Sequence, residues 1–513
     1  MRNLISRFLI ILTLLFLVGS TNIYSQGLNH SFLVGYTQGL DTNVISHRGQ
    51  LEFDSNSVNV IPKNFKMPFR AAQANISDEN GNLLMVTNGC WIADASGDTM
   101  QNGGGLNPGS FTTTWCDATT GQPTPNMGVF LPYPGDSTKY ILFHQTGNDT
   151  LNYMSSELYY SVIDMNLNGG LGAVTQKNVI LIQDILNPGL AACKHANGRD
   201  WWITILKVST DTVYKILLTP QGISSITKQS LGFPSHGYYG GQTQFSPDGN
   251  KFAYYPAFGF GSVVHNEIRV SDFDRCTGMF NNSRRMVFID SITGAGLSFS
   301  PNSQYLYYDT FKKIYQLNTD TINIGASLDT VASYDGYAYP YNFMQTDFWD
   351  MYLAANGKIY ITSGNGVIDL HCISAPDSEG IACNVLQHSL RLPCYSGRGN
   401  VYHPNYYLGP VLGSICDSLA HVGLQEHLQE VQNFNISPNP IHGGQLRITY
   451  LLPQNLSGIF EIYDLNGKLL YSLQLPPWSS LQYISLPFFD SGIYQCCIKS
   501  GFSIATKKLV VIK

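Results

Sequence analysis

Apolar and aromatic stretches of strand length, separated by polar turns, recur through most of the chain. The clearest examples are Phe245-Ser-Pro-Asp-Gly-Asn-Lys-Phe-Ala-Tyr-Tyr255, Phe299-Ser-Pro-Asn-Ser-Gln-Tyr-Leu-Tyr-Tyr308 and Leu353-Ala-Ala-Asn-Gly-Lys-Ile-Tyr-Ile361. Each has a polar turn of two or three residues between a short strand and an aromatic-rich strand, which is typical of a β-hairpin. The pattern therefore predicts a hairpin that repeats along the chain.

The repeat has a period close to 54 residues. The strong copies turn at Gly249, Ser303 and Gly357, and weaker copies turn at Gly81, Gly135 and Gly198, so that successive spacings are 54, 63, 51, 54 and 54. A repeat of this length, with about four strands and no helical periodicity, is typical of a β-propeller blade. Residues 26–410 have room for about seven blades, and six or eight remain open.

Only six hairpins are visible, so we expect the seventh blade to be shared between the two ends of the repeat region. Strands at Phe32–Gly35, Gln50–Asp54 and Val58–Ile61 would pair with strands that follow Leu386. Closing the ring in this way would bury the end strands, whose unpaired backbone groups otherwise promote aggregation.

Composition narrows the class of protein. Only 12% of the 513 residues are charged, about half of the usual share, while the chain holds 49 Gly, 31 Tyr and 26 Phe. With 43% apolar residues the chain can bury a core, so wholesale disorder is excluded. The net charge of −6 excludes a basic nucleic-acid-binding protein.

The N-terminus has the layout of a secretory signal peptide. Arg2 and Arg7 precede the apolar run Phe8–Val18, and small or polar residues follow as far as Ser25. Residues 1–25 are therefore expected to be removed before Gln26, since the run is shorter than the roughly 20 apolar residues of a membrane-spanning helix. No later stretch has spanning length, so we expect no transmembrane segment in the mature chain.

The C-terminal residues predict a second, smaller domain. After a polar linker at residues 411–433, short alternating strands recur between residues 434 and 513, with turns at Asn466-Gly467 and Ser491-Gly492. Alternation with regular turns is typical of a β-sandwich. The expected fold class is thus all-β, with a β-propeller at residues 26–410 followed by a small immunoglobulin-like sandwich.

The motifs of this second domain resemble the C-terminal sorting domain of type IX secretion cargo. They are Ser437-Pro-Asn-Pro440, Ile462-Tyr-Asp-Leu-Asn-Gly-Lys468, Ser491-Gly-Ile-Tyr494 and Lys507-Lys-Leu-Val-Val-Ile-Lys513. The motif positions carried over are Pro438, Asn439, Pro440, Gly467, Lys468, Gly492, Tyr494 and Lys508. The resemblance implies recognition by the outer-membrane translocon and a secreted or surface-attached product. Cys496-Cys497 departs from the pattern, because that strand usually carries apolar residues.

The repeat region also resembles a large family of secreted β-propeller proteins from Bacteroidota. The resemblance lies in Asn75-Ile-Ser-Asp-Glu-Asn-Gly-Asn-Leu-Leu84, Met100-Gln-Asn-Gly-Gly-Gly-Leu106, Val162-Ile-Asp-Met-Asn-Leu-Asn-Gly-Gly-Leu-Gly172 and Asp272-Phe-Asp-Arg-Cys-Thr-Gly278. His403-Pro-Asn-Tyr-Tyr-Leu-Gly-Pro410 resembles its closing segment. Because most members are uncharacterised, the resemblance implies little about activity.

No catalytic signature stands out. His-Glu-x-x-His, Gly-x-Ser-x-Gly, a phosphate-binding loop and Cys-x-x-Cys are all absent from the sequence. A metal site would need scattered histidines to converge, the candidates being His195, His236, His265, His371 and His403. Asp272 and Asp274 could be paired carboxylates for glycoside hydrolysis, although turn formation explains them better. We therefore predict no catalytic, cofactor or metal residues.

Tryptophans and cysteines carry the remaining expectations. Trp91, Trp115 and Trp202 are the candidate ligand platform. Trp201 and Trp349 could also present rings to a ligand, but packing in the core is the better explanation for them. Ten cysteines in an exported chain predict disulfides, with no more than four free thiols. Proximity favours Cys90 with Cys116, and Cys383 with Cys394 or Cys416.

The expected function is that of a secreted or surface β-propeller that binds glycan or protein without catalysis. The alternative is an extracellular hydrolase or lyase acting on polysaccharide or peptide, because propellers host such chemistry and a fold does not fix a function.

Overall fold

The computed structural model describes residues 27–36, 45–54, 57–116, 121–151, 153–233, 239–257, 264–290, 292–340, 343–417, 434–442, 445–452, 457–477, 479–486, 489–500 and 503–512. The expected signal peptide and most of the expected linker lie outside these residues. No helix in the described ranges is long and apolar enough to cross a membrane.

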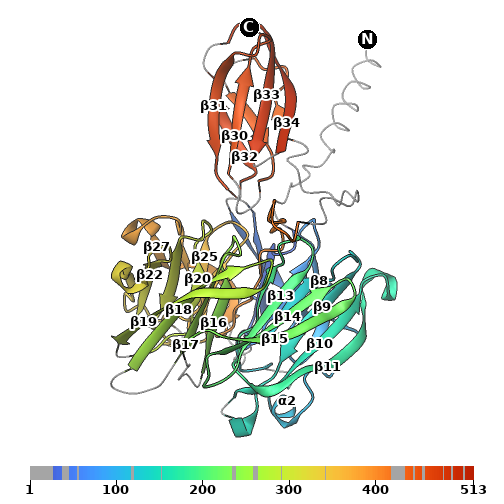
Figure 1. Cartoon of the computed structure of the whole chain (residues 1–513), viewed down its shortest axis with the longest axis vertical. Helices are drawn as coiled ribbons and strands as arrows, with labels where there is room; N and C mark the ends of the chain where they lie inside the picture. The colour runs from blue at the N-terminus through green and yellow to red at the C-terminus, as the bar shows by residue number, and fades with distance from the viewer. Residues whose placement is uncertain are drawn as a thin grey trace.

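Antiparallel sheets arranged as seven propeller blades make up the described part of the larger domain (Figure 1). Blade 1 holds β1 (Ser31–Val34), β2 (Arg48–Phe53) and β3 (Val58–Lys63); blade 2 holds β4 (Ala74–Ser77), β5 (Leu83–Thr87), β6 (Trp91–Asp94) and β7 (Thr99–Gly104); blade 3 holds β8 (Gly128–Pro132), β9 (Lys139–Gln145), β10 (Ser155–Asp164) and β11 (Ala173–Leu186). A parallel bridge between Ala173 and Gln101 joins blades 2 and 3 into one eight-stranded sheet.

The remaining four blades have four strands each in sequence order. Blade 4 holds β12 (Ala191–Lys194), β13 (Trp201–Leu206), β14 (Thr212–Thr219) and β15 (Gly222–Ser230); blade 5 holds β16 (Tyr239–Phe245), β17 (Lys251–Ala257), β18 (Val264–Asp274) and β19 (Met279–Asp290); blade 6 holds β20 (Leu297–Phe299), β21 (Tyr305–Asp309), β22 (Lys313–Asn318) and β23 (Asp329–Ser333); blade 7 holds β24 (Met351–Leu353), β25 (Ile359–Ile361), β26 (Val367–Ile373) and β27 (Val385–Ser396). Short helical turns lie between strands, namely α2 (Ser110–Trp115), η1 (Asp149–Leu151), η2 (Asn168–Gly170), η3 (Ile324–Ser327) and η4 (Gly380–Cys383).

The six repeated turns are confirmed as the hairpins that join the first two strands of blades 2 to 7. All six turn residues have a positive φ, for example +74° at Gly249 and +63° at Ser303. The side chain of Asp248 fixes the turn at Gly249 by accepting a hydrogen bond from the backbone N–H of Asn250 at 3.0 Å. The repeat is therefore visible in the sequence because each blade depends on the same local turn chemistry.

The seventh blade differs in detail from the expectation. Strands β1, β2 and β3 pair only with one another among the described strands, and β27, which follows Leu386, pairs with β26 of blade 7. The two ends of the ring still meet, because Val401 packs in one core cluster with Phe32 and Leu51 of blade 1. Among the described strands no sheet is therefore shared across this junction, and side chains of blade 1, blade 7 and the residues after β27 pack across it.

Aromatic side chains fill the spaces between blades. The ring centroid of Phe53 in blade 1 lies 5.2 Å from that of Tyr360 in blade 7, and Tyr255 in blade 5 lies 6.0 Å from Tyr308 in blade 6. Alternate residues of a strand point to opposite faces of its sheet, so each middle strand contacts both neighbouring blades. The high Tyr and Phe content is therefore used largely between the blades.

The C-terminal domain is the expected two-sheet sandwich. One sheet has the order β28 (Asn435–Ser437), β29 (Gln445–Thr449), β32 (Leu481–Ser485), and the other has the order β31 (Leu469–Leu475), β30 (Gly458–Tyr463), β33 (Gly492–Ser500), β34 (Ser503–Val511). Leu446, Phe460 and Cys496 are buried in its core. Burial raises the pKa of the Cys496 thiol to about 12, so this cysteine acts as a small apolar residue where the sorting-domain pattern usually has one.

Two adjacent tyrosines in β21 provide a test of the packing between blades. Both are fully buried, and the Tyr307 hydroxyl donates a hydrogen bond of 2.8 Å to the carbonyl of Pro376, whereas the Tyr308 hydroxyl has no partner among the described residues. We expect Tyr307→Phe to lower the free energy of unfolding by about 1–3 kcal/mol and Tyr308→Phe to leave it unchanged or raise it. Urea unfolding of both variants checks this, and equal losses would contradict it.

Candidate ligand-binding face

The ring has two distinct faces. In blades 2 to 7 the first strand lies nearest the centre, and consecutive first strands such as β16, β20 and β24 contact one another. We call the face on which these strands begin the loop face and the face on which they end the tail face. The six repeated hairpin turns lie on the tail face, and α2 lies on the loop face, at the bottom of the ring in Figure 1.

The tail face is closed at its centre by the closing segment, residues 401–408. The Tyr402 hydroxyl donates to the carbonyl of Ala192 at 3.1 Å, and the Tyr406 hydroxyl donates to that of Phe130 at 2.9 Å. Nε2 of His403 hydrogen bonds the carbonyl of Asn75 at 2.9 Å. A single short segment therefore holds blades 2, 3 and 4.

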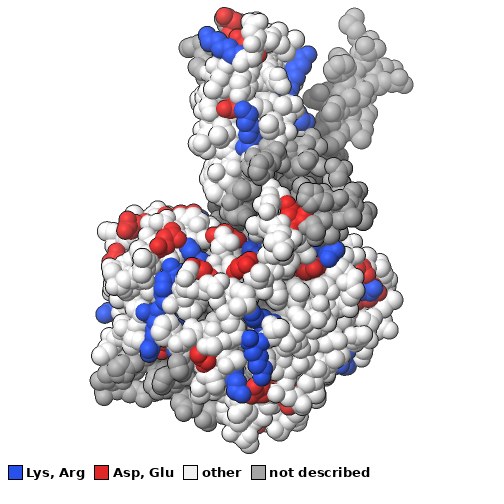
Figure 2. All heavy atoms as spheres, in the orientation of Figure 1, with Lys and Arg blue, Asp and Glu red and all other residues white. Residues whose placement is uncertain are grey.

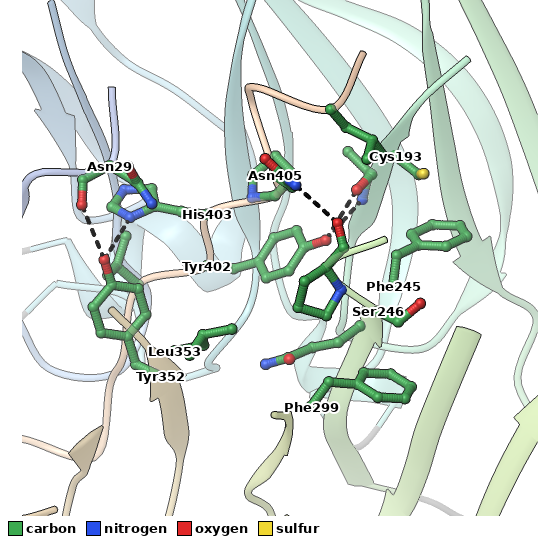
Figure 3. A pocket seen from close by; sticks show the side chains of 16 residues that line it. Asn29, Cys193, Phe245, Ser246, Phe299, Tyr352, Leu353, Tyr402, His403 and Asn405 are labelled. Carbon is green, nitrogen blue, oxygen red and sulfur yellow. Dashed lines mark hydrogen bonds between the residues drawn. The ribbon is translucent and has the colours of Figure 1, made fainter. Parts of the chain in front are cut away.

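Figure 3 shows the same segment reaching two further blades. The Asn405 amide donates to the carbonyl of Pro247 in blade 5 at 2.8 Å, and the Tyr352 hydroxyl in blade 7 lies 2.9 Å from Nδ1 of His403. The space left has a volume of about 40 Å³ for the centres of water molecules, enough for a few waters. Burial lowers the pKa of His403 to about 4, so its ring is neutral and serves this network.

Beyond the closing segment the chain is fastened to the tail face. The backbone N–H of Val411 donates to the carbonyl of Ala196 at 2.8 Å, and the guanidinium of Arg275 donates to the carbonyl of Gly409 at 2.6 Å. Cys416 then forms a disulfide with Cys276. The chain is therefore fastened to the tail face as far as Cys416.

The cysteines correct one expected pairing. Cys90 and Cys116 form the disulfide that proximity favoured, but Cys416 pairs with Cys276, 140 residues away, and Cys383 and Cys394 are buried free thiols. The described residues hold six free cysteines in all, more than the four expected. Proximity along the chain failed here because these side chains fill gaps in the core, where burial raises the pKa of the Cys394 thiol to about 12.

The three candidate tryptophans have different environments. Trp202 is only 6% exposed, and its indole N–H donates to the carbonyl of Arg275 at 2.8 Å, so it belongs to the core and cannot be a ligand platform. Trp91 is half-buried at the start of β6 and packs against the cluster of Met67 and Phe69. Trp115, at the end of α2, is half-buried on the loop face.

Trp115 belongs to a curved group of side chains on the loop face, which we call the Arg–Trp arc. The guanidinium carbon of Arg70 lies 4.5 Å from the centre of the Trp115 ring, and that of Arg398 lies 5.6 Å from the centre of the Trp349 ring. The ring of Phe311 lies 4.8 Å from that of Trp349. The arc, Trp115, Arg70, Arg398, Trp349 and Phe311, brings loops of several blades together.

The loops that carry the arc are held rigidly. The disulfide partner Cys116 directly follows Trp115, and the amide of Gln122 donates to the Thr112 hydroxyl of α2 at 2.9 Å. At the other end, Nε of Arg398 donates to the carbonyl of Gly364 at 2.7 Å. Arg70, Arg398 and Phe311 could not be identified from the sequence, because isolated residues far apart in the chain show no pattern until the ring closes.

Two buried carboxyl groups lie where blades 6 and 7 begin on the loop face. Asp309 packs against the backbone of Gly294 and Gly296, where a Cβ would overlap its oxygens. Burial raises the pKa of Asp350 to about 8. Burial, together with Asp350, also raises the pKa of Asp309; nearby backbone amides offset part of that rise without reaching hydrogen-bond geometry. Asp350 is therefore largely protonated and uncharged near neutral pH.

The structure does not assemble the catalytic or metal sites considered from the sequence. Asp274 accepts a hydrogen bond from the backbone N–H of Cys276 at 2.8 Å, and Asp272 pairs with Arg284 at 2.6 Å, so each has a structural partner. His195 and His371 lie on different blades, and no metal-binding group of three or more His, Cys, Asp or Glu occurs in the described ranges. His236 and the side chain of His265 lie outside the described residues.

The buried carboxyl of Asp350 predicts a pH-dependent stability. Its pKa rises from 3.8 in the unfolded chain to about 8 in the folded protein. Between these values the folded state holds a proton that the unfolded state lacks, so stability falls as pH rises through this window and levels off above it. We expect Asp350→Asn to flatten the fall of Tm between pH 5 and 8, whereas exposed Asp98→Asn keeps the wild-type slope. Equal slopes in all three proteins would contradict this.

Comparisons with known proteins identify the C-terminal domain. Residues 435–513 match the family described as secretion system C-terminal sorting domain. No curated protein matches the chain. Among solved structures, the similarity is 10% identity and a TM-score of 0.34 to Kuenenia stuttgartiensis hydrazine synthase, over 70% of this chain and 99% of that one.

Two further structures are similar at the same low level. A putative TolB from Agrobacterium tumefaciens has 16% identity and a TM-score of 0.29 over 56% of this chain and 87% of that one. The extracellular domain of a putative hybrid two component system from B. thetaiotaomicron has 9% identity and a TM-score of 0.28 over 91% and 62%. These values carry no argument about activity. The sorting domain shows that the chain is exported by type IX secretion to the cell surface or beyond, and the sheets described above make its larger domain a β-propeller.

Proposed function

We propose that this protein acts outside the cell as a non-catalytic binding protein, and that the loop face is its binding surface for glycan. The observation that carries the proposal is the Arg–Trp arc, in which the half-buried rings of Trp115, Trp349 and Phe311 are presented on rigid loops. Flat aromatic rings pack against the apolar faces of sugar rings and bury large apolar areas. The tail face is sealed by the closing segment, which leaves the loop face for recognition.

The surface charge agrees with recognition by a few defined side chains. Figure 2 shows a surface that is mostly uncharged in this view, with acidic and basic residues interspersed. Only 12% of all residues are charged. Broad electrostatic attraction is therefore weak, and affinity would come from ring stacking and local hydrogen bonds.

The alternative of a hydrolase or lyase has less support. Glycoside hydrolysis needs two carboxyl groups that reach a substrate from opposite sides. The pair at the start of blades 6 and 7, Asp309 and Asp350, is fully buried. Asp347, nearer to the arc, is also buried and accepts the backbone N–H of Gly364 at 2.9 Å. These carboxyls support the fold of the loop face and do not reach a ligand.

Binding to a panel of immobilised polysaccharides tests the proposal. We expect saturable binding to at least one polysaccharide, with a loss of tenfold or more in affinity for Trp115→Ala and Trp349→Ala. Tyr483→Ala removes an exposed ring from the C-terminal domain and should bind as wild type does. Degradation of the polysaccharide, or affinities that are equal in all variants, would contradict the proposal.

The sorting domain predicts the fate of a truncated chain. A chain that ends at residue 433 keeps the closing segment and the Cys276–Cys416 disulfide, so we expect it to fold with a Tm within a few degrees of the full chain. In the native host it should remain in the periplasm, whereas the full chain carrying Trp349→Ala should be secreted normally. Immunoblotting of cell fractions measures this, and normal secretion of the truncated chain would show that residues 434–513 do not direct export.

A further inference from the structure

We infer that the ligand of the loop face is an acidic glycan, whose carboxylate or sulfate groups bind the two arginines of the Arg–Trp arc. The inference rests on the proposed function and adds the chemical class of the ligand. Its basis is the state of the two guanidinium groups, Arg70 and Arg398, which are held in place without being neutralised.

Arg70 is the clearer of the two. Its guanidinium is half-buried against the Trp115 ring, and it makes no hydrogen bond or ion pair with any described residue. A guanidinium has five N–H donors, so all of them remain available. Stacking on an aromatic ring fixes the planar group through the ring quadrupole and leaves its donor edge open.

Arg398 repeats this arrangement on the neighbouring loop. Its Nε donates a hydrogen bond to the carbonyl of Gly364, which orients the guanidinium over the Trp349 ring. Its terminal nitrogens have no partner among the residues described. The Asp347 carboxyl interacts electrostatically with Arg398 but forms no ion pair with it in the described structure. Burial raises the pKa of Asp347, and its oxygens accept bonds from Gly364 and Asn365. The positive charge of Arg398 is thus left for a ligand.

The two arginines are neighbours because their loops touch. The backbone N–H of Gly399 donates to the carbonyl of Arg70 at 3.1 Å. A Cβ at Gly397 would overlap the carbonyl oxygen of Arg70, and one at Gly399 would overlap that of Ala71. Only glycine on both sides of Arg398 allows the loops to approach this closely, so the backbone geometry itself places two cationic side chains on one patch.

The chemistry of the patch selects the ligand. Arginine forms bidentate hydrogen bonds to planar carboxylates and to oxyanions such as sulfate. The aromatic rings beside each guanidinium provide surfaces for sugar rings. The buried carboxyl of Asp350 does not oppose an anion, since its raised pKa of about 8 keeps it largely protonated near neutral pH. A sugar chain that carries regular anionic groups satisfies both features, whereas an acidic peptide uses only the arginines.

Two matched polysaccharides separate the outcomes, namely polygalacturonate and its fully methyl-esterified form. We expect the full-length protein to bind polygalacturonate at least tenfold more tightly, with affinity falling as salt rises. A sulfated galactan and its desulfated form make a second pair, which distinguishes sulfate from carboxylate as the preferred anion.

Substitutions then assign the effect to the arc. Arg70→Gln and Arg398→Gln remove the charge and keep a polar side chain, so each should lower affinity for the acidic form at least fivefold and leave the neutral form unchanged. Arg447→Gln removes an exposed charge from the C-terminal domain and is the control. Unchanged Tm values confirm that the variants fold, and Arg70→Lys should restore binding only in part because lysine is not bidentate.

The results that overturn the inference are distinct from those that overturn the proposed function. If the acidic and neutral polysaccharides bind equally well and Trp349→Ala still abolishes binding, the loop face binds glycan but does not select an acidic one. Polyglutamate binding as tight as polygalacturonate, and insensitive to Trp115→Ala, would indicate an acidic protein ligand and contradict the glycan assignment. An absence of binding to every polysaccharide would overturn both.

Discussion

Closure of the ring depends on the hydrogen bonds that the closing segment makes to backbone carbonyls of the inner strands. Tyr402, Tyr406 and His403 each reach a carbonyl on a different blade. Buried carbonyl groups need donors, and at the crowded centre of a ring these donors must come from side chains. Each bond contributes only about 0.5–1.5 kcal/mol, but together they join blade 4 to blades 2 and 3, with which it shares no sheet. This network also decides which face of the protein can bind a ligand.

The consequence for function follows from where the chain goes next. After the closing segment, Arg275 and the Cys276–Cys416 disulfide hold the chain on the tail face as far as Cys416. Export machinery therefore contacts a domain that leaves from one face of the ring, while the Arg–Trp arc lies on the other. The two tasks, export and recognition, are separated by the ring itself.

The sequence predicted those features that local chemistry determines. The hairpin at Gly249 and the strands of the sorting domain were predictable because turns and alternation are encoded within a few residues. The pairing of Cys276 with Cys416 and the contact of Arg70 with Gly399 were not, since each joins positions far apart in the chain. Of the candidate tryptophans, Trp115 lies on the loop face and Trp202 is buried in the core, a difference that the sequence could not reveal because adjacent tryptophans give no sign of which one is buried. The arginines of the arc carried no sequence signal at all.

The proposed ligand site would let a weakly charged protein recognise charge. Arg70 and Arg398 are positioned by aromatic stacking, and burial keeps the Asp350 carboxyl on the same face largely uncharged near neutral pH. Little ordering of side chains remains to be done on binding, which is the main advantage of a preorganised site. The same rigidity follows from the Cys90–Cys116 disulfide beside Trp115 and from the glycines that flank Arg398.

A crystal structure of the protein with an oligogalacturonate tests the central claim most directly. The account predicts sugar rings stacked on Trp115 or Trp349, with carboxylates in hydrogen-bond contact with Arg70 and Arg398 and the closing segment unchanged. An oligosaccharide bound on the tail face, or in the polar groove between blades 1 and 2 lined by His30, Gln50 and Lys63, would contradict it.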